Sequence, residues 1–270
     1  MTRRGAGPVC VYKLGGPAVE DQSLVRLLAG AVRAPGQRAV LVHGGGRQIE
    51  RLLEKLEVPS RFVGGRRQTS EAAMAVVEMV LSGEVNKRLA AALTGAGTPA
   101  LGLSGRDAGL IRARRKPGLG EVGTPETVDP RALVAAWDAG LFPVVSPVCF
   151  GAHGGPLNVN ADEAALGLAR ALRARALVYL SDVDGVRVGG EPVERITAAE
   201  AHRLIKDGTI SGGMRLKVQV ALEAARAGIP EVVIGGGARL AGVFAGTRVL
   251  LDGSGPRRRV TTKRRKEVAR

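Results

Sequence analysis

The sequence is poor in the residues that several classes of protein require. It has only two cysteines, Cys10 and Cys149, each inside an apolar run. Two isolated cysteines make neither a disulfide framework nor a metal site, so we expect two buried structural thiols. The three histidines show neither zinc-ligand spacing nor a Ser-His-Asp arrangement. We therefore predict no protein-bound metal.

Long apolar runs and aromatic clusters are also missing. No stretch approaches 18 consecutive apolar residues, which excludes a membrane-spanning helix. Residues 8–14 are too short for a signal peptide and contain Lys13, so we expect a cytoplasmic protein. Aromatic residues make up 3% of the chain and do not alternate with basic residues, which excludes the stacking platforms of single-strand nucleic-acid binders.

Positive charge, in contrast, is abundant and unevenly distributed. The net charge is +15, and residues 256–270 contribute seven of these charges through eight Lys or Arg and one Glu. We interpret this segment as a disordered basic tail. A solvated extension without a specific partner is favoured, and contact with nucleic acid or an acidic surface is the alternative. The moderately basic body suits small anionic substrates.

Apolar periodicity predicts an α/β fold. Apolar residues make up 45% of 270, enough for a sizeable core in one large domain or two modest lobes. Short apolar runs alternate with segments whose apolar residues lie three and four positions apart, which is typical of a mainly parallel sheet covered by helices on both faces. The expected strands are residues 8–14, 38–43, 99–104, 142–148, 176–183 and 231–236, and the expected helices are residues 23–32, 47–56, 70–93 and 162–174.

Local signals refine this pattern. Ser70 suits a helix start, and Asp129 followed by Pro130 predicts a helix with Asp129 as cap and Pro130 at its first position. Residues 118–129 lack helical periodicity and are rich in turn formers, which indicates a small hairpin or surface excursion. We expect a soft lobe boundary at residues 173–176.

Glycine clusters follow several of the expected strands. "KLGGP", "HGGGR" and "LSGRD" do so, and "ISGGMRLK" begins at residue 210. In a parallel sheet, ligands bind beyond the carboxyl ends of the strands, where glycines let consecutive N–H groups face an anion. Neither G-x-x-x-x-G-K-[ST] nor a dinucleotide-binding G-x-G-x-x-G is present. The loops "KLGGP" and "HGGGR", each directly after an expected strand, therefore indicate a phosphate site of another kind.

Charged and amide side chains lie beside these loops in the sequence. Lys13 interrupts an apolar strand, where an unpaired ammonium is costly; the alternative is that it reaches water at the strand end. Lys217 follows the last glycine cluster, and phosphoryl transfer needs such cations. In "LNVNADEAA", one interpretation is that Asn160 and Asp162 cap a helix. The other is functional: Asp162 would orient two lysines, and Asn158 would bind a polar substrate. Neither interpretation is favoured.

Two further motifs are ambiguous by themselves. "GGRRQT" places an arginine pair, Arg66 and Arg67, before a long helix; arginine forks bind carboxylates, although a solvated charge pair is the better interpretation in isolation. His43 begins the triple-glycine loop, where it suits fixing the loop through its ring nitrogens.

In this order the motifs resemble the acetylglutamate kinase family of the amino acid kinase superfamily. The similar segments are "YKLGG", "VHGGG", "GRRQT", "VVEMVLSGEVNKRL", "GLSGRDAGLIRARR", "LNVNADEAA", "LVYLSDVDGV" and "ISGGMRLKV", over residues 8–250. The resemblance implies a three-layer αβα sandwich with a central, mainly parallel sheet. It also implies transfer of the γ-phosphoryl group of ATP, with Mg²⁺, to the side-chain carboxylate of N-acetyl-L-glutamate in arginine biosynthesis.

The resemblance also implies a role for each matching residue. Lys13 and Lys217 would stabilise the transition state, and Asp162 would hold both lysines. No base is required, because the acceptor carboxylate is already ionised. The implied substrate-binding residues are Gly45, Gly46, Arg67 and Asn158, and the implied nucleotide-binding residues are Gly15, Gly16, Leu180, Ser181, Asp182, Val183, Asp184, Gly185, Thr209, Ile210 and Ser211.

Three departures from the family pattern qualify the resemblance. Arg66 stands where the family has an apolar residue beside the clamp arginine; Arg67 aligns best with the clamp, and the adjacent Arg66 is the alternative. The N-terminal helix and the acidic C-terminal segment of arginine-inhibited members have no counterpart, so we expect a homodimer through residues 70–93 without arginine feedback. The basic tail, residues 256–270, is the third departure. The expected lobes are residues 1–175 for the amino acid substrate and dimerisation and residues 176–255 for ATP.

Two alternatives to acetylglutamate phosphorylation remain. A kinase acting on carrier-protein-linked aminoadipate or glutamate would suit the basic body, but such relatives depart from "HGGG" and "NVNAD", which are intact here. A non-catalytic protein on the same fold, contacting nucleic acid through its tail, would have no use for Lys13, Asp162 and Lys217 together. A glutamate 5-kinase would need an additional C-terminal domain.

Overall fold

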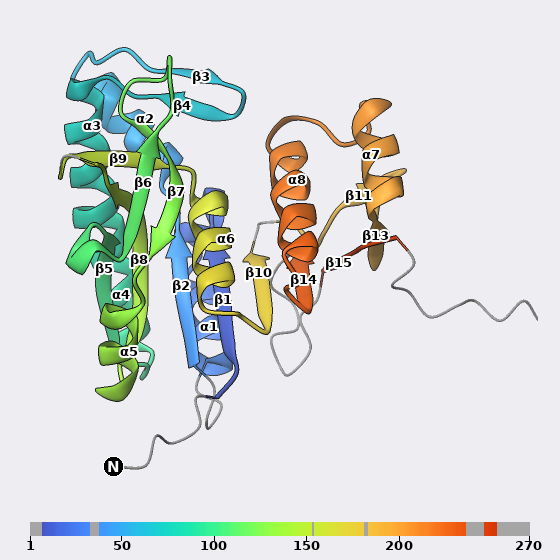
Figure 1. Ribbon diagram of the computed structural model, residues 1–270, viewed down its shortest axis with the longest axis horizontal. Coiled ribbons are helices and arrows are strands. Elements are labelled where there is room, and N and C mark those ends of the chain that lie inside the picture. Colours follow the sequence, from blue (N-terminus) through green and yellow to red (C-terminus); the bar gives the residue numbers. More distant parts are fainter. Residues whose placement is uncertain (1–6, 33–37, 153, 181–182, 236–245, 253–270) are drawn as a thin grey trace, which may run out of the picture.

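The computed structural model describes residues 7–32, 38–152, 154–180, 183–235 and 246–252. Within these residues, one mixed sheet of 11 strands forms the middle layer, and helices pack on both of its faces (Figure 1). The predicted αβα sandwich is therefore confirmed. No helix in the described ranges has the length and apolar character needed to cross a bilayer.

The six predicted strands form the continuous parallel part of the sheet, and residues 181, 182 and 236 of the predicted ranges lie outside the described residues. The strand order is β13-β15-β14-β10-β1-β2-β8-β6-β7-β9, with β5 also paired to β8. Neighbours run parallel from β14 through β10, β1 and β2 to β8 and β5, as expected for strands separated by helices. Their bounds are Val9–Leu14 (β1), Arg38–His43 (β2), Ala100–Gly105 (β5), Phe142–Phe150 (β8), Ala176–Leu180 (β10) and Glu231–Ile234 (β14).

Shorter strands complete the sheet and form two separate hairpins. Residues 118–129, predicted as a small hairpin or surface excursion, contain one strand, β7. It pairs antiparallel with β6, which precedes the predicted segment. The β3–β4 and β11–β12 pairs stand outside the main sheet. The bounds are Arg61–Val63 (β3), Arg66–Gln68 (β4), Ile111–Arg115 (β6), Val122–Val128 (β7), Pro156–Val159 (β9), Arg187–Val188 (β11), Glu191–Pro192 (β12), Arg195–Thr197 (β13) and Thr247–Leu250 (β15).

The predicted helices are present with two differences, and two further helices, α7 and α8, were not predicted. The predicted helix over residues 70–93 begins at its Ser70 cap but contains a seven-residue π-helical segment, η2. The helix predicted to begin at Pro130 begins one residue later, and Asp129 accepts a hydrogen bond from the Arg131 amide. The bounds are Gly16–Val19 (η1), Gln22–Ala31 (α1), Gly46–Lys55 (α2), Glu71–Glu78 (α3), Met79–Val85 (η2), Asn86–Gly95 (α4), Asp107–Gly109 (η3), Arg131–Asp138 (α5), Ala161–Ala171 (α6), Ala198–Lys206 (α7) and Gly212–Arg226 (α8).

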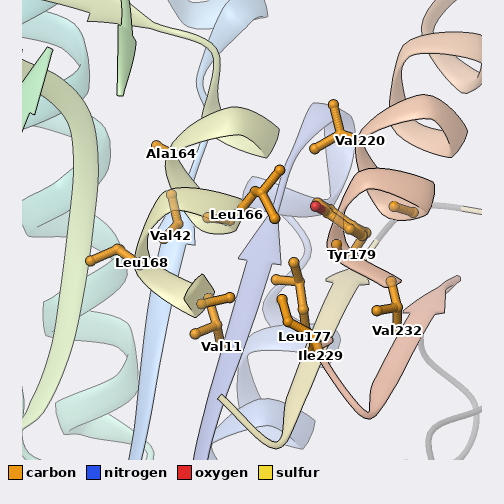
Figure 2. Packing of buried hydrophobic residues seen from close by; sticks show 14 of the residues in the cluster. Val11, Val42, Ala164, Leu166, Leu168, Leu177, Tyr179, Val220, Ile229 and Val232 are labelled. Carbon is orange, nitrogen blue, oxygen red and sulfur yellow. The ribbon is translucent and has the colours of Figure 1, made fainter. Parts of the chain in front are cut away.

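The core consists of two apolar layers, one on each face of the sheet. Because side chains alternate along a strand, Val11 of β1 lies on the α6 and α8 face, whereas Tyr12 lies on the α1 and α4 face. Figure 2 shows Val11, Leu177 and Tyr179 of the first layer beside α6 and α8. The same alternation directs Lys13 toward α6. Both cysteines are buried thiols that form no disulfide within the described residues, as predicted.

The division into two lobes stays a prediction. The expected boundary at residues 173–176 falls between α6 and β10. The apolar layer beneath α6 and α8 includes residues from both sides of that boundary.

Candidate functional site

A cavity of about 200 Å³ lies where the chain leaves β1 and β2 at their carboxyl ends. This is the edge of a parallel sheet at which ligands bind. The cavity wall comes from the two glycine loops, the β3–β4 hairpin, η2 and the β9–α6 junction. The lining residues are Lys13, Gly15, Gly44, Gly45, Gly46, Ile49, Phe62, Gly65, Arg66, Arg67, Leu81, Val122, Pro147, Asn158, Val159, Asn160, Ala161 and Asp162.

The two glycine loops lie side by side, as their positions after neighbouring strands predict. Leu14 and His43 are paired at the ends of β1 and β2, and the Gly44 amide donates a hydrogen bond to the Leu14 carbonyl at 2.8 Å. Gly45 is the N-cap of α2, so the amide end of that helix borders the cavity. A Cβ on Gly45 would lie 2.8 Å from Cδ2 of Leu81, so this position leaves little room for a side chain.

Lys13 forms a buried ion pair with Asp162. Nζ of Lys13 lies 2.8 Å from Oδ1 of Asp162, and the two side chains are only 9% and 10% exposed. The contact is electrostatic, because Oδ1 accepts no well-directed hydrogen bond from any described group. The capping role belongs to Asn160, whose side chain accepts from the amides of Asp162 and Glu163. Asp162 therefore faces Lys13 rather than the helix end.

Gly15 gives the ammonium its space. A Cβ at this position would lie 2.2 Å from Nζ of Lys13. Any larger residue would push the lysine away from Asp162. Gly15 thus lets the Lys13 ammonium lie beside Asp162 without displacement.

His43 stabilises the loop and lies outside the cavity lining. Its Nδ1 lies 2.9 Å from the Gly44 carbonyl, which can only accept, so Nδ1 carries the proton. Nε2 then accepts from the Asn86 side chain at 3.1 Å. Full burial is the main cause that lowers the pKa of His43 from 6.5 to about 4, so the ring is neutral at physiological pH. This agrees with the structural interpretation from the sequence.

The two arginines of "GGRRQT" lie on opposite sides of β4. Arg67 is buried, and its guanidinium contacts the Glu50 carboxylate, the Ser60 hydroxyl and the Gly46 carbonyl. It also stacks on Phe62, with 4.6 Å from Cζ to the ring centroid. Arg66 instead faces α6, where Glu163 accepts from its Nε at 3.2 Å and its Nη2 at 2.5 Å.

Asn158 is connected to Arg67 through Thr69. Nδ2 of Asn158 donates to the Thr69 hydroxyl at 3.0 Å, and that hydroxyl donates to the Arg67 carbonyl at 2.8 Å. The structure thus brings together all the predicted residues at the acceptor side, including Gly45 and Gly46.

The predicted residues of the C-terminal part lie apart from this cavity. Lys217 is half-buried on α8 and is not among the lining residues. Its neighbour Leu216 approaches the β3–β4 turn, since a Cβ on Gly65 would lie 3.2 Å from Cδ2 of Leu216. The first turns of α8 therefore reach the hairpin that borders the cavity.

The predicted nucleotide-binding residues lie in three places: after β1, after β10 and before α8. Gly15 lines the cavity, and Gly16 begins η1. Leu180 is buried at the end of β10, and Ile210 is buried before α8 between the exposed Thr209 and Ser211. Ser181 and Asp182 lie outside the described residues, and Val183, Asp184 and Gly185 follow them.

Several lining residues were not predicted from the sequence. Leu81 and Pro147 carry no sequence signal for a ligand site. Phe62 lies on a three-residue strand that no periodicity indicates. Glu50 does not line the cavity, but it contacts Arg67 from α2 and was not predicted either. Gly44 is the exception, because it belongs to the triple-glycine loop that was predicted as a whole.

Comparison with known proteins agrees with this geometry. The profile of the amino acid kinase family matches residues 8–236. The chain belongs to the amino acid kinase family. The family predicted from the motifs is thereby confirmed.

Named members of this family are similar over most of their length. The acetylglutamate kinase of Rubrobacter xylanophilus is 46% identical over 241 residues, which cover 88% of this chain and 94% of that protein. The acetylglutamate kinase of Gluconobacter oxydans is 42% identical over 250 residues, covering 86% and 85%.

Solved structures support the same fold. The protein smu.665 from Streptococcus mutans has a TM-score of 0.78 and 28% identity, covering 90% of this chain and 98% of that chain. Carbamate kinase from Giardia lamblia bound to AMP-PNP has a TM-score of 0.65 at 18% identity, covering 92% and 99%, which shows likeness of fold alone.

Proposed function

We propose that this protein transfers the γ-phosphoryl group of ATP to the side-chain carboxylate of N-acetyl-L-glutamate, producing N-acetyl-L-glutamyl 5-phosphate for arginine biosynthesis. The observation that carries the proposal is the convergence of Lys13, two glycine loops and Arg67 on one cavity. The similarity to acetylglutamate kinases supports the choice of acceptor.

Transition-state stabilisation is the main catalytic task in this reaction. Negative charge spreads over the oxygens of the moving phosphoryl group, and fixed cations and N–H groups stabilise it. Lys13, held by Asp162, and the amide end of α2 supply such groups on the acceptor side. Lys217 is proposed as the second cation; it lies on α8, whose first turns reach the hairpin that borders the cavity. The acceptor carboxylate attacks without a base, which agrees with a neutral His43 outside the lining.

Arg67, rather than Arg66, is proposed to bind the α-carboxylate of the acceptor. Three of the five N–H donors of Arg67 are used by Glu50, Ser60 and the Gly46 carbonyl. Within the described ranges, its Nε–H and one Nη2–H have no partner, so they remain for a ligand. The Nε and Nη2 edge of Arg66 is already matched by Glu163. Asn158 would bind the amide of the acceptor.

The nucleotide is proposed to bind at residues 180–185 and 209–211, with its phosphates toward Gly15 and Gly16. Mg²⁺ enters as MgATP, because this ion prefers phosphate and water oxygens to all-protein cages. In the described part of the chain, no three His, Cys, Asp or Glu side chains cluster as a metal site. Mg²⁺ is therefore treated as part of the substrate.

A cytoplasmic homodimer with its interface along α3, η2 and α4 completes the proposal. Met79 on η2 is 56% exposed, and burial of such a side chain favours association. The lobes at residues 1–175 and 176–255 would bind the acceptor and the nucleotide. A mass measurement by light scattering tests the dimer, and a monomer or hexamer would contradict it.

The reaction is tested by trapping acyl phosphate with hydroxylamine. N-acetyl-L-glutamate, L-glutamate and a carrier-bound substrate are offered in parallel with MgATP. We expect hydroxamate only with N-acetyl-L-glutamate, and none with the Lys13→Met variant. Product with the carrier-bound substrate alone would favour the alternative kinase, and silence with all three would reject the enzyme assignment.

A further inference from the structure

The β3–β4 hairpin contributes Phe62, Gly65, Arg66 and Arg67 to the lining of the acceptor cavity. Its two strands pair only with each other, outside the main sheet. A lone two-stranded hairpin is marginally stable in water. At the end of β4, Thr69 is fixed because its amide donates to the Leu119 carbonyl at 3.0 Å. The opposite end, the Gly64–Gly65 turn, needs another attachment.

Arg66 supplies a contact at that end. Its guanidinium makes a two-pronged contact with Glu163 in the first turn of α6, and Nη1 lies 3.4 Å from the Gly64 carbonyl. The two ionic side chains are 19% and 15% exposed, so the pair is partly shielded from water and salt. The hydrogen-bonded Glu163 carboxylate raises the pKa of Arg66 against the opposing effect of burial, and the charge of Glu223 adds to it.

The Arg66–Glu163 contact lies where the β3–β4 hairpin meets α6 and α8. A second cavity of about 320 Å³ is lined by groups from all three elements, including Arg66, Glu163, Leu216 and Glu223. Leu216 also approaches Gly65. A change at Arg66 therefore acts where the acceptor-side hairpin meets the helix that carries Lys217.

We infer that Arg66 is a positioning residue that, through Glu163, holds the β3–β4 hairpin on α6 and so fixes Arg67 over the acceptor cavity. Arg66 and Arg67 are consecutive on one strand, so their side chains point to opposite sides. Glu163 directly follows Asp162, so one helical turn positions both the hairpin and the partner of Lys13. The inference rests on the proposed acceptor for its kinetic consequence but not for the attachment itself.

The test compares Arg66→Leu, Glu163→Gln and the double variant with Arg61→Leu as matched control. Arg61 is an exposed arginine of the same hairpin and contacts Gln68 instead of α6. We expect Arg66→Leu and Glu163→Gln each to raise KM for N-acetyl-L-glutamate about 3- to 10-fold, with kcat changed less than about twofold. The double variant should resemble the single variants, because both remove one interaction.

Hydrogen exchange without substrate separates this inference from the proposed function. We expect amides of residues 61–68 to exchange faster in Arg66→Leu and Glu163→Gln than in Arg61→Leu. Faster exchange in a protein inactive on N-acetyl-L-glutamate would reject the proposed function and support the attachment. Unchanged exchange, with or without a raised KM, would overturn the inference. Additive effects of the two substitutions on KM would overturn it as well.

Discussion

Replacing Asp162 by asparagine should remove the negative charge beside Lys13 while nearly preserving side-chain volume. The Lys13 ammonium, only 9% exposed, would then remain without its counter-charge. Breaking a buried ion pair by removing one partner costs about 3–5 kcal/mol. Because a tenth of each side chain still reaches solvent, we expect the lower end, about 3 kcal/mol.

This loss of stability can be measured by thermal denaturation followed by circular dichroism. In a domain of this size, 1 kcal/mol shifts Tm by about 2–4 °C, so Asp162→Asn should lower Tm by about 6–12 °C. The matched control is Asp129→Asn, since Asp129 pairs with an Arg131 side chain that is 85% exposed. That control should leave Tm almost unchanged.

The double variant Lys13→Met/Asp162→Leu separates stability from catalysis. Apolar replacement of both members of a buried pair is often neutral or stabilising, so the double variant should be more stable than Asp162→Asn. Its activity should nevertheless be lost. Asp162→Asn should lower kcat about 10²–10³-fold, the size seen when one group that stabilises transition-state charge is removed.

Two results would refute this reasoning. If Asp162→Asn lowered Tm no more than Asp129→Asn, the Lys13–Asp162 pair would contribute no more to stability than an exposed ion pair. If the Asp162→Asn enzyme kept wild-type kcat and changed only KM, the pair would act in ground-state binding and not in the transition state.

Two other predictions follow from the same site. Gly15→Ala should cut kcat at least about tenfold by displacing the Lys13 ammonium, whereas Gly30→Ala, which meets no atom within 4 Å, should leave kcat unchanged in the same assay. The pKa of His43 is about 4 when folded, and the ordinary value is 6.5, so the unfolded chain binds its proton first as pH falls from 6.5 toward 4. The free energy of unfolding should therefore fall by about 2 kcal/mol between pH 7 and pH 5 because of His43. In urea unfolding, the His43→Gln variant should lack this part of the pH dependence; the same pH dependence in both proteins would contradict the prediction.

Much of the fold follows from local patterns in the sequence. The central strands were predicted because strands buried on both faces read as continuous apolar runs, and β1 and β2 agree within one residue. The α6 start was predicted within one residue, because Asn160 and Asp162 before an amphipathic run suit helix capping; the cap is Asn160. The short β3 and β4 strands were not predicted, because three residues contain no period. The π-helical η2 was missed because its apolar spacing differs little from that of an ordinary helix.

By itself, the sequence determined the αβα architecture, the glycine loops at strand ends and the family, since these depend on short-range order. Only the tertiary structure decided which charges meet. Lys13 and Asp162 are 149 positions apart, and Arg66 and Glu163 are 97 apart. Their contacts depend on strand register and on how α6 packs across β1. No local pattern specifies that packing. Only the folded chain therefore showed that Arg66 contacts Glu163 whereas Arg67 contacts Glu50.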